Sequence, residues 1–290
     1  MKKMLFVILT ITSIQAQCDW NDDGFVDVLD VVSTVNCILS DCWQMDIYGC
    51  TDPEAINYNP DATIDDGSCE YETTVTDIDG NAYSTVTIGD QEWMAENLKV
   101  THYRNGDPIP GDLTEDEWTH LVDSETGAYA VCPWTNDDVS LATCAGDCSE
   151  IYGNLYNGYA VDDERGICPE GWLVPRDGDW QELVDYLGDN DIAGGPLKAT
   201  GTVENGDGLW LDPNYGATNE TGFSAIPGGE CTCYNGAYYT MGTAGRFWSS
   251  TEHNSNYNWS RELYCYSSGI NRSYYGKGTG YSIRCVRLLD

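Results

Sequence analysis

The residues best suited to a chemical role lie near the amino end, where side chains that carry oxygen recur at regular spacing. In residues 19–30 they occupy positions 1, 3, 5, 9 and 12 of a loop, and Gly24 occupies position 6. Calcium takes six to eight hard oxygen ligands, and such a loop needs a glycine at its sharp turn. The pattern predicts a Ca²⁺ site, with a plain acidic turn as the alternative. Its ligands would be Asp19, Asn21, Asp23, the carbonyl of Phe25, Asp27 and Asp30.

This loop resembles the repeat of the dockerin family. It ends in Asp30, where an EF-hand loop ends in Glu, and residues 28–39 resemble the helix that follows a dockerin loop. A dockerin carries two such units, whereas residues 17–44 hold one complete unit. The resemblance therefore implies calcium binding without implying a cohesin partner.

Residues 45–72 form a second small segment, bounded by cysteines and rich in Pro, Asn and Asp. It resembles a short motif of secreted marine bacterial proteins, and the resemblance implies a disulfide between Cys50 and Cys69. Five of its side chains suit either a further calcium site or Asx turns. They are Asp52, Asn59, Asp61, Asp65 and Asp66.

A third candidate site is aromatic. Residues 252–281 interleave tyrosines and a tryptophan with Ser, Asn and Gly, a composition typical of antibody paratopes. The alternative is a set of strands with one wet tyrosine face. As a site it would suit an extracellular glycan or a protein partner, because these rings have an apolar body and a polar tip. The candidate ligand-binding residues are Tyr257, Trp259, Tyr264, Tyr266, Tyr274 and Tyr275.

The amino terminus indicates export. Lys2 and Lys3 precede an apolar run over residues 4–11 and a short polar stretch, which is the order of a secretory signal. We expect cleavage after Ala16, so that residues 1–16 are the signal peptide of a secreted or cell-surface bacterial protein. The apolar run is too short to span a bilayer, and we expect no transmembrane segment.

The composition of the chain limits the classes of partner that it can bind. Thirteen cysteines in an exported chain predict a disulfide framework, with one cysteine left over. The formal net charge of −35 makes nucleic acid and anionic membrane poor partners, because like charges repel.

The aromatic residues belong to a body over residues 73–290. Short runs such as residues 84–88 and 261–266 predict strands, and two helices are expected. Thr114 begins a capping box that leads into Trp118, Leu121 and Val122. Asp177 is predicted to cap a second helix, with Trp180, Leu183, Val184 and Leu187 on its apolar face. The pattern predicts an α+β domain.

Several motifs follow one another along this body. They are residues 77–83, 152–157 and 222–229, Trp93-Met-Ala-Glu-Asn-Leu98, Cys168-Pro-Glu-Gly-Trp-Leu-Val-Pro175, Phe247-Trp-Ser-Ser-Thr251 and Ser282-Ile-Arg-Cys-Val-Arg287. Together these motifs resemble those of the Fibrobacter succinogenes major paralogous domain family. The resemblance implies a C-type-lectin-like fold, with a Cys168–Cys285 bridge. The last motif is similar to the closing strand of the formylglycine-generating enzyme group. We expect Trp93, Trp172, Trp180, Phe223, Phe247 and Trp248 to be core residues.

Sequence motifs of known catalytic sites are weak or absent. The three histidines lack the spacing of zinc ligands, and no motif of the Gly-x-Ser-x-Gly kind occurs. The sequence therefore favours a secreted binding protein rather than an enzyme. The alternatives are an extracellular glycosidase, an enzyme of the formylglycine-generating type that uses cysteines such as Cys265, and a structural surface component.

Overall fold

The computed structural model describes residues 46–289, apart from 54, 56, 70–72 and 132–147. The signal peptide and the calcium ligands between Asp19 and Asp30 lie outside the described residues, as does the dockerin-like segment 17–44. The chain divides into two compact units, residues 1–71 and 72–290. Each unit is described by itself. Among the described residues, no helix is long and apolar enough to cross a membrane.

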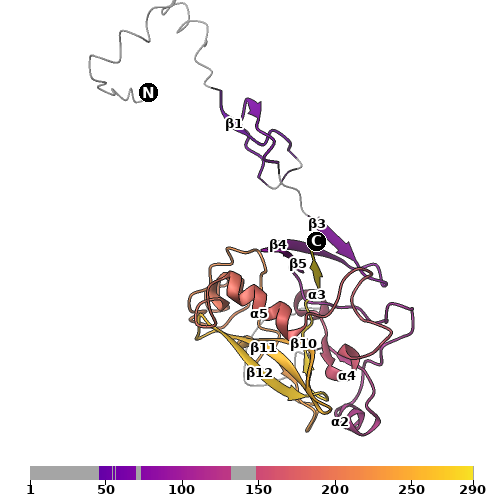
Figure 1. Cartoon of the computed structure of the whole chain (residues 1–290). Coiled ribbons are helices and arrows are strands. Elements are labelled where there is room, and N and C mark those ends of the chain that lie inside the picture. Colours follow the sequence, from indigo (N-terminus) through magenta and orange to yellow (C-terminus); the bar gives the residue numbers. More distant parts are fainter. Residues whose placement is uncertain (1–45, 54, 56, 70–72, 132–147, 290) are drawn as a thin grey trace, which may run out of the picture. The chain divides into compact units, whose positions relative to one another are not determined.

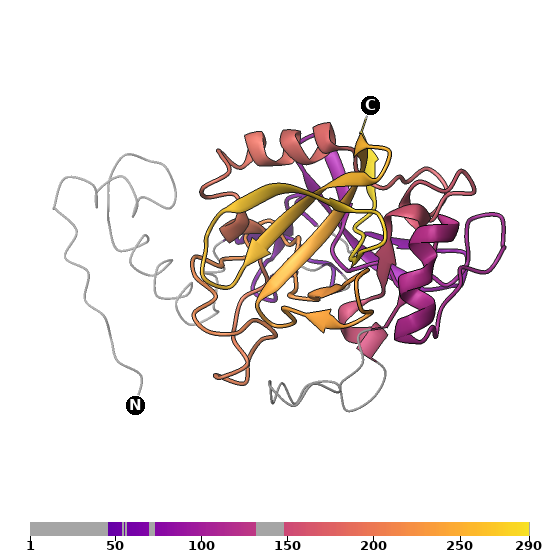
Figure 2. The same ribbon diagram turned by 90° about the horizontal axis from the view of Figure 1, so that it is seen from below.

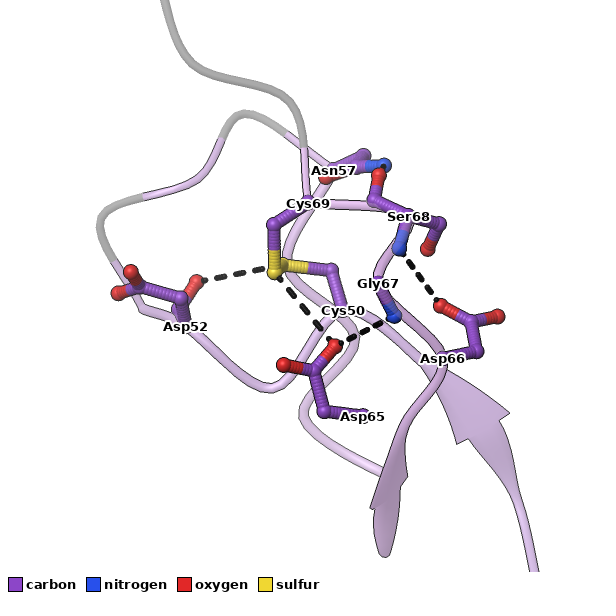
Figure 3. Close-up of a disulfide and its surroundings, with 8 residues drawn as sticks. All are labelled: Cys50, Asp52, Asn57, Asp65, Asp66, Gly67, Ser68 and Cys69. Carbon is purple, nitrogen blue, oxygen red and sulfur yellow. Dashed lines mark hydrogen bonds between the residues drawn. A yellow bond between two sulfur atoms is a disulfide. The ribbon is translucent and has the colours of Figure 1, made fainter.

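The described part of the first unit is a small disulfide-closed loop. Two short strands, β1 (Tyr48–Gly49) and β2 (Ile64–Asp65), pair in parallel, and Cys50 is bonded to Cys69 as expected. Figure 3 shows the turns beside this disulfide, in which Gly67 N–H donates to Asp65 Oδ1 over 3.0 Å and Ser68 N–H donates to Asp66 Oδ1 over 3.0 Å. These two aspartates therefore form the Asx turns that were one of the two interpretations of their sequence.

The second unit is rich in strands, which form three sheets (Figure 1). The four-stranded sheet has the order β14-β5-β4-β3, and the three-stranded sheet has the order β10-β11-β12. The five-stranded sheet, of very short strands, has the order β6-β7-β13-β8-β9. The bounds of the first sheet are β3 Thr73–Thr76, β4 Ala82–Ile88, β5 Gln91–Met94 and β14 Val286–Leu288. Those of the second are β10 Ala244–Asn254, β11 Tyr257–Tyr264 and β12 Ile270–Gly276, and those of the third are β6 Tyr129–Ala130, β7 Leu155–Asn157, β8 Glu230–Cys231, β9 Tyr238–Tyr239 and β13 Gly280–Tyr281.

Two longer helices occur where the sequence predicted them. The helix α2 (Glu115–Ser124) has the expected capping box at Thr114. Trp118 and Leu121 are buried, whereas Val122 is 41% exposed. The helix α5 (Asp177–Tyr186) begins with Arg176 as its N-cap, so the prediction that Asp177 caps it is wrong. The expectation of only two helices is also wrong, because the described residues include three short ones. These are α3 Cys148–Tyr152, α4 Gly158–Val161 and α6 Gly194–Leu197.

The core is built on aromatic rings. Trp180 of α5 packs against Trp93, Phe223 and Phe247, with ring centroids 4.7–6.1 Å apart. The six aromatic residues predicted as core are all buried, which confirms that expectation. Figure 2 shows α5 lying along the sheet of β10, β11 and β12. The disulfide between Cys168 and Cys285 fixes the residue that precedes β14 to the middle of the chain. The result is a mixed, strand-rich domain with few helices.

Candidate binding site

The register of the β10-β11-β12 sheet divides the six predicted aromatic residues between its two faces. Trp259 lies opposite Tyr274, and Asn258 lies opposite Tyr275. Because side chains alternate along a strand, Tyr257, Trp259 and Tyr274 share one face. Tyr264 and Tyr275 belong to the other face. The six residues therefore do not form a single site.

On the first face, five side chains form a group that we call the outer aromatic cluster. Its members are His253 of β10, Tyr257 and Trp259 of β11, and Arg272 and Tyr274 of β12. The ring of His253 stacks on Tyr274 with centroids 4.0 Å apart and an interplanar angle of 8°. Trp259 and Tyr257 each stand at 87° to Tyr274, with centroids 5.6 and 5.9 Å away. Tyr257 is 39% exposed and Tyr274 is 50% exposed, so the cluster presents rings to solvent.

Ion pairs hold one member of this cluster, Arg272, in place. The guanidinium carbon of Arg272 lies 3.3 Å from the ring centroid of Trp259. Arg272 Nη2 also donates to Asp177 Oδ2 over 2.8 Å, while Arg261 Nη1 donates to Asp177 Oδ1 over 2.6 Å. Burial alone would raise the pKa of Asp177, but the hydrogen bonds from Arg272 and Arg261 hold it below its usual value. The ionised carboxylate thus fixes Arg272 over the tryptophan.

The second face of the sheet is turned toward the interior. Arg246 pairs with Glu230 and lies 3.7 Å from Glu262 through its Nε atom. The Tyr264 hydroxyl donates to Glu262 Oε2 over 2.9 Å, and burial followed by the charge of Glu262 raises the pKa of Tyr264. Tyr275 packs its ring against the buried Tyr281 at 5.2 Å. Tyr264 and Tyr275 therefore belong to the buried polar network around Arg246 and Glu262.

Tyr266 follows the end of β11 and stacks on Tyr264, with ring centroids 5.1 Å apart. Its side chain is 62% exposed. It lies with the residues of the second face, so it is separate from the outer aromatic cluster.

Cys265 has the free thiol that a cysteine enzyme would need, but its surroundings do not activate it. The residue is buried, and burial raises the pKa of its thiol. A nucleophilic cysteine needs the opposite shift, because the thiolate is the reactive form. The ammonium of Lys198 lies near enough to oppose this shift, yet it donates to three backbone carbonyls, those of Tyr215, Tyr264 and Ser267.

Two members of the cluster, His253 and Arg272, were not predicted from the sequence. Among the described residues, no group of three or more His, Cys, Asp or Glu side chains is placed to hold a metal ion, and His253 instead lies against the rings of Trp259 and Tyr274. Arg272 and Tyr274 are two residues apart, so they lie on the same face of β12. Using this signal to predict the cluster requires knowledge of how β12 pairs with β11.

The comparisons with known proteins give one relationship. The family model of the Fibrobacter succinogenes major domain matches residues 86–287, a range that includes all three strands of the candidate site. No curated protein and no solved structure matches the chain. The match covers more than half of the sequence, and the chain therefore belongs to the Fibrobacter succinogenes major domain family.

Proposed function

We propose that the protein is a secreted or cell-surface binding protein whose outer aromatic cluster recognises a neutral glycan chain. The observation that carries the proposal is the group of exposed rings on three neighbouring strands. Tyrosine and tryptophan rings offer an apolar face to the C–H groups of a sugar, and a tyrosine hydroxyl can bond its hydroxyl groups. The formal charge of −35 favours a neutral glycan over an acidic one.

The geometry of the rings supports an individual chain as the ligand. Tyr257 and Trp259 stand nearly perpendicular to Tyr274, so the three rings do not form a flat strip. A flat polysaccharide surface would need coplanar rings, whereas a single chain can contact rings at different angles. The ion pairs of Arg272 and Arg261 with Asp177 keep the cluster ordered before the ligand arrives, which lowers the entropic cost of binding.

The proposal also includes an extracellular location and a fold class. The Cys50–Cys69 and Cys168–Cys285 disulfides support an oxidising, extracellular location. We assign the body to the C-type-lectin-like folds, on the support of its mixed sheets, its long loops and the disulfide that ties its carboxyl end to its middle.

The test is binding of the secreted chain to an array of neutral glycans, followed by affinity measurements on the best ligand. Tyr274→Ala and Trp259→Ala should each weaken binding about tenfold or more, because each removes a stacking ring. Tyr266→Ala is the matched control, since it removes an exposed tyrosine outside the cluster. Equal losses in all three variants, or no neutral glycan bound at all, would refute the proposal.

We further propose that residues 19–30 bind Ca²⁺ as a dockerin-like module that acts as a spacer or docking tag. The support is the spacing of oxygen ligands around Gly24. Calorimetric titration of the full chain with calcium should show a tight site that Asp23→Ala removes. Asp66→Ala should keep this site, because Asp66 only closes a local turn with Ser68. If both variants bind calcium as the natural chain does, the loop is an acidic turn.

A further inference from the structure

The sheet of β10, β11 and β12 has two edges that differ in regularity. At one edge, β10 forms a bridge through Phe247 to Ser282, and its register with β11 shifts on either side of Glu252. Such bulges twist an edge away from further pairing. At the other edge, β12 is the last strand of the sheet and pairs with β11 without a shift in register (Figure 1). The edge of β12 is therefore regular enough to pair with another strand.

One hydrogen bond shows which backbone groups of β12 point away from β11. The Ile270 N–H donates to the Asn190 carbonyl over 2.8 Å, so it is not bonded to β11. Because the direction of the backbone groups alternates along a strand, those of Arg272 and Tyr274 also point outward. In the part of the chain that the structure describes, no backbone partner bonds these outward groups. The edge therefore presents two N–H donors and two carbonyl acceptors.

These four groups are complementary to those of a second copy of the chain. Arg272 and Tyr274 flank Ser273, so a two-fold axis at Ser273 places Arg272 of one copy opposite Tyr274 of a second, antiparallel copy. Two residues in such a pair exchange both of their N–H···O bonds, and the symmetry repeats the pair on the other side of the axis. A second copy therefore provides a partner for all four groups.

The charge on this strand does not prevent the pairing. A charged side chain on an edge strand usually blocks another strand, and β12 carries one, Arg272. Its guanidinium is bonded to Asp177 over 2.8 Å and lies over the ring of Trp259, so its charge is balanced within the chain. In the paired sheet, Tyr274 of the second copy lies beside this guanidinium on the same face, and an aromatic ring beside a cation is a favourable neighbour.

We propose that the protein forms a symmetric dimer through β12, in which the three-stranded sheets of two copies join into one continuous sheet. The dimer places the outer aromatic clusters of the two copies next to each other on one face. A glycan chain long enough to reach both clusters binds the dimer more tightly than a single copy. The pairing of the strands itself does not depend on the proposed glycan binding.

Hydrogen exchange of the full secreted chain tests this pairing without any substitution. At low protein concentration, the amides of Arg272 and Tyr274 should exchange rapidly, whereas those of Ser273 and Tyr275, which point toward β11, should be protected. As the concentration rises, the Arg272 and Tyr274 amides should exchange about tenfold more slowly, while light scattering shows the mass of a dimer. Salt should favour the dimer, because it screens the repulsion between two chains of formal net charge −35.

Two substitutions at one position separate the backbone from the side chain. Tyr274→Pro removes an outward N–H, and proline is tolerated where the N–H of an edge strand faces solvent. It should abolish the dimer, whereas Tyr274→Ala keeps the N–H and should weaken the dimer less. Thr74→Pro is the matched control, because it removes an outward N–H from β3, the edge strand of another sheet. It should leave the dimer unchanged.

If Tyr274→Pro fails to fold, the exchange pattern of the natural chain decides the matter. Three results would overturn the proposal. The first is a monomer at every concentration and salt level. The second is a dimer in which the Arg272 and Tyr274 amides still exchange rapidly. The third is a dimer that Thr74→Pro abolishes and Tyr274→Pro retains.

Discussion

Asp177 connects the helix α5 to the sheet that carries the outer aromatic cluster. Its carboxylate accepts hydrogen bonds from Arg261, which is fully buried, and from Arg272, which covers the Trp259 ring. A single residue therefore compensates a buried charge and positions a surface ring. Removing it should affect both stability and binding.

We expect Asp177→Asn to lower the free energy of unfolding by about 3 kcal/mol, because the Arg261 cation then lacks its only partner carboxylate within ion-pair distance in the described chain. Chemical denaturation at neutral pH measures the loss. Asp185→Asn on the same helix is the control, since Asp185 is exposed and accepts a hydrogen bond from Gln181. It should change the stability by less than about 0.5 kcal/mol. Equal effects of both variants would show that the buried pairing contributes nothing.

The same carboxylate predicts a dependence of stability on acid. The pKa of Asp177 is lower in the folded chain than its usual value. Its contribution to stability is therefore complete above the unfolded pKa and is lost as the pH falls through the folded pKa. Denaturation midpoints measured from neutral to strongly acidic pH should fall more steeply for the natural chain than for Asp177→Asn.

At the level of helices, sequence signals within one segment predicted where that segment becomes helical. The α2 helix begins where the capping box of Thr114 and Glu117 indicated, because both partners lie within one turn. The start of α5 was misassigned by one residue. Asp177 has the residue type of an N-cap, but its carboxylate bonds arginines 84 and 95 positions away in the sequence. Spacing along one segment cannot reveal such partners.

The aromatic site shows the same limit. Composition identified the segment, and three of the six predicted residues do lie together on one face. The other three, Tyr264, Tyr266 and Tyr275, lie away from this face, because the face of each residue depends on the pairing of β11 with β10 and β12. His253 and Arg272 join the cluster for that reason, from strands whose register the sequence alone did not define.

At the scale of the whole molecule, disulfides secure the units. Both pairs were expected from family resemblance and are bonded in the structure. The two bonds differ in the length of chain that they close, with sequence separations of 19 and 117. A longer closed loop removes more entropy from the unfolded chain, so the second bond should contribute more to stability.

We therefore expect the double variant Cys168→Ala/Cys285→Ala to lose about 4 to 5 kcal/mol of unfolding free energy in the unit of residues 72–290. The chain between the two cysteines includes α5 and the strands β10, β11 and β12, so loss of the bond should destabilise the buried core around Trp180 as well as β14. Tryptophan fluorescence during denaturation reports on that core, since Trp93 and Trp180 are both buried in it. The matched double variant Cys50→Ser/Cys69→Ser should leave this transition unchanged, because its bond lies in the other compact unit. If both double variants unfold at the same denaturant concentration, the Cys168–Cys285 bond is not what stabilises the carboxyl end of the domain.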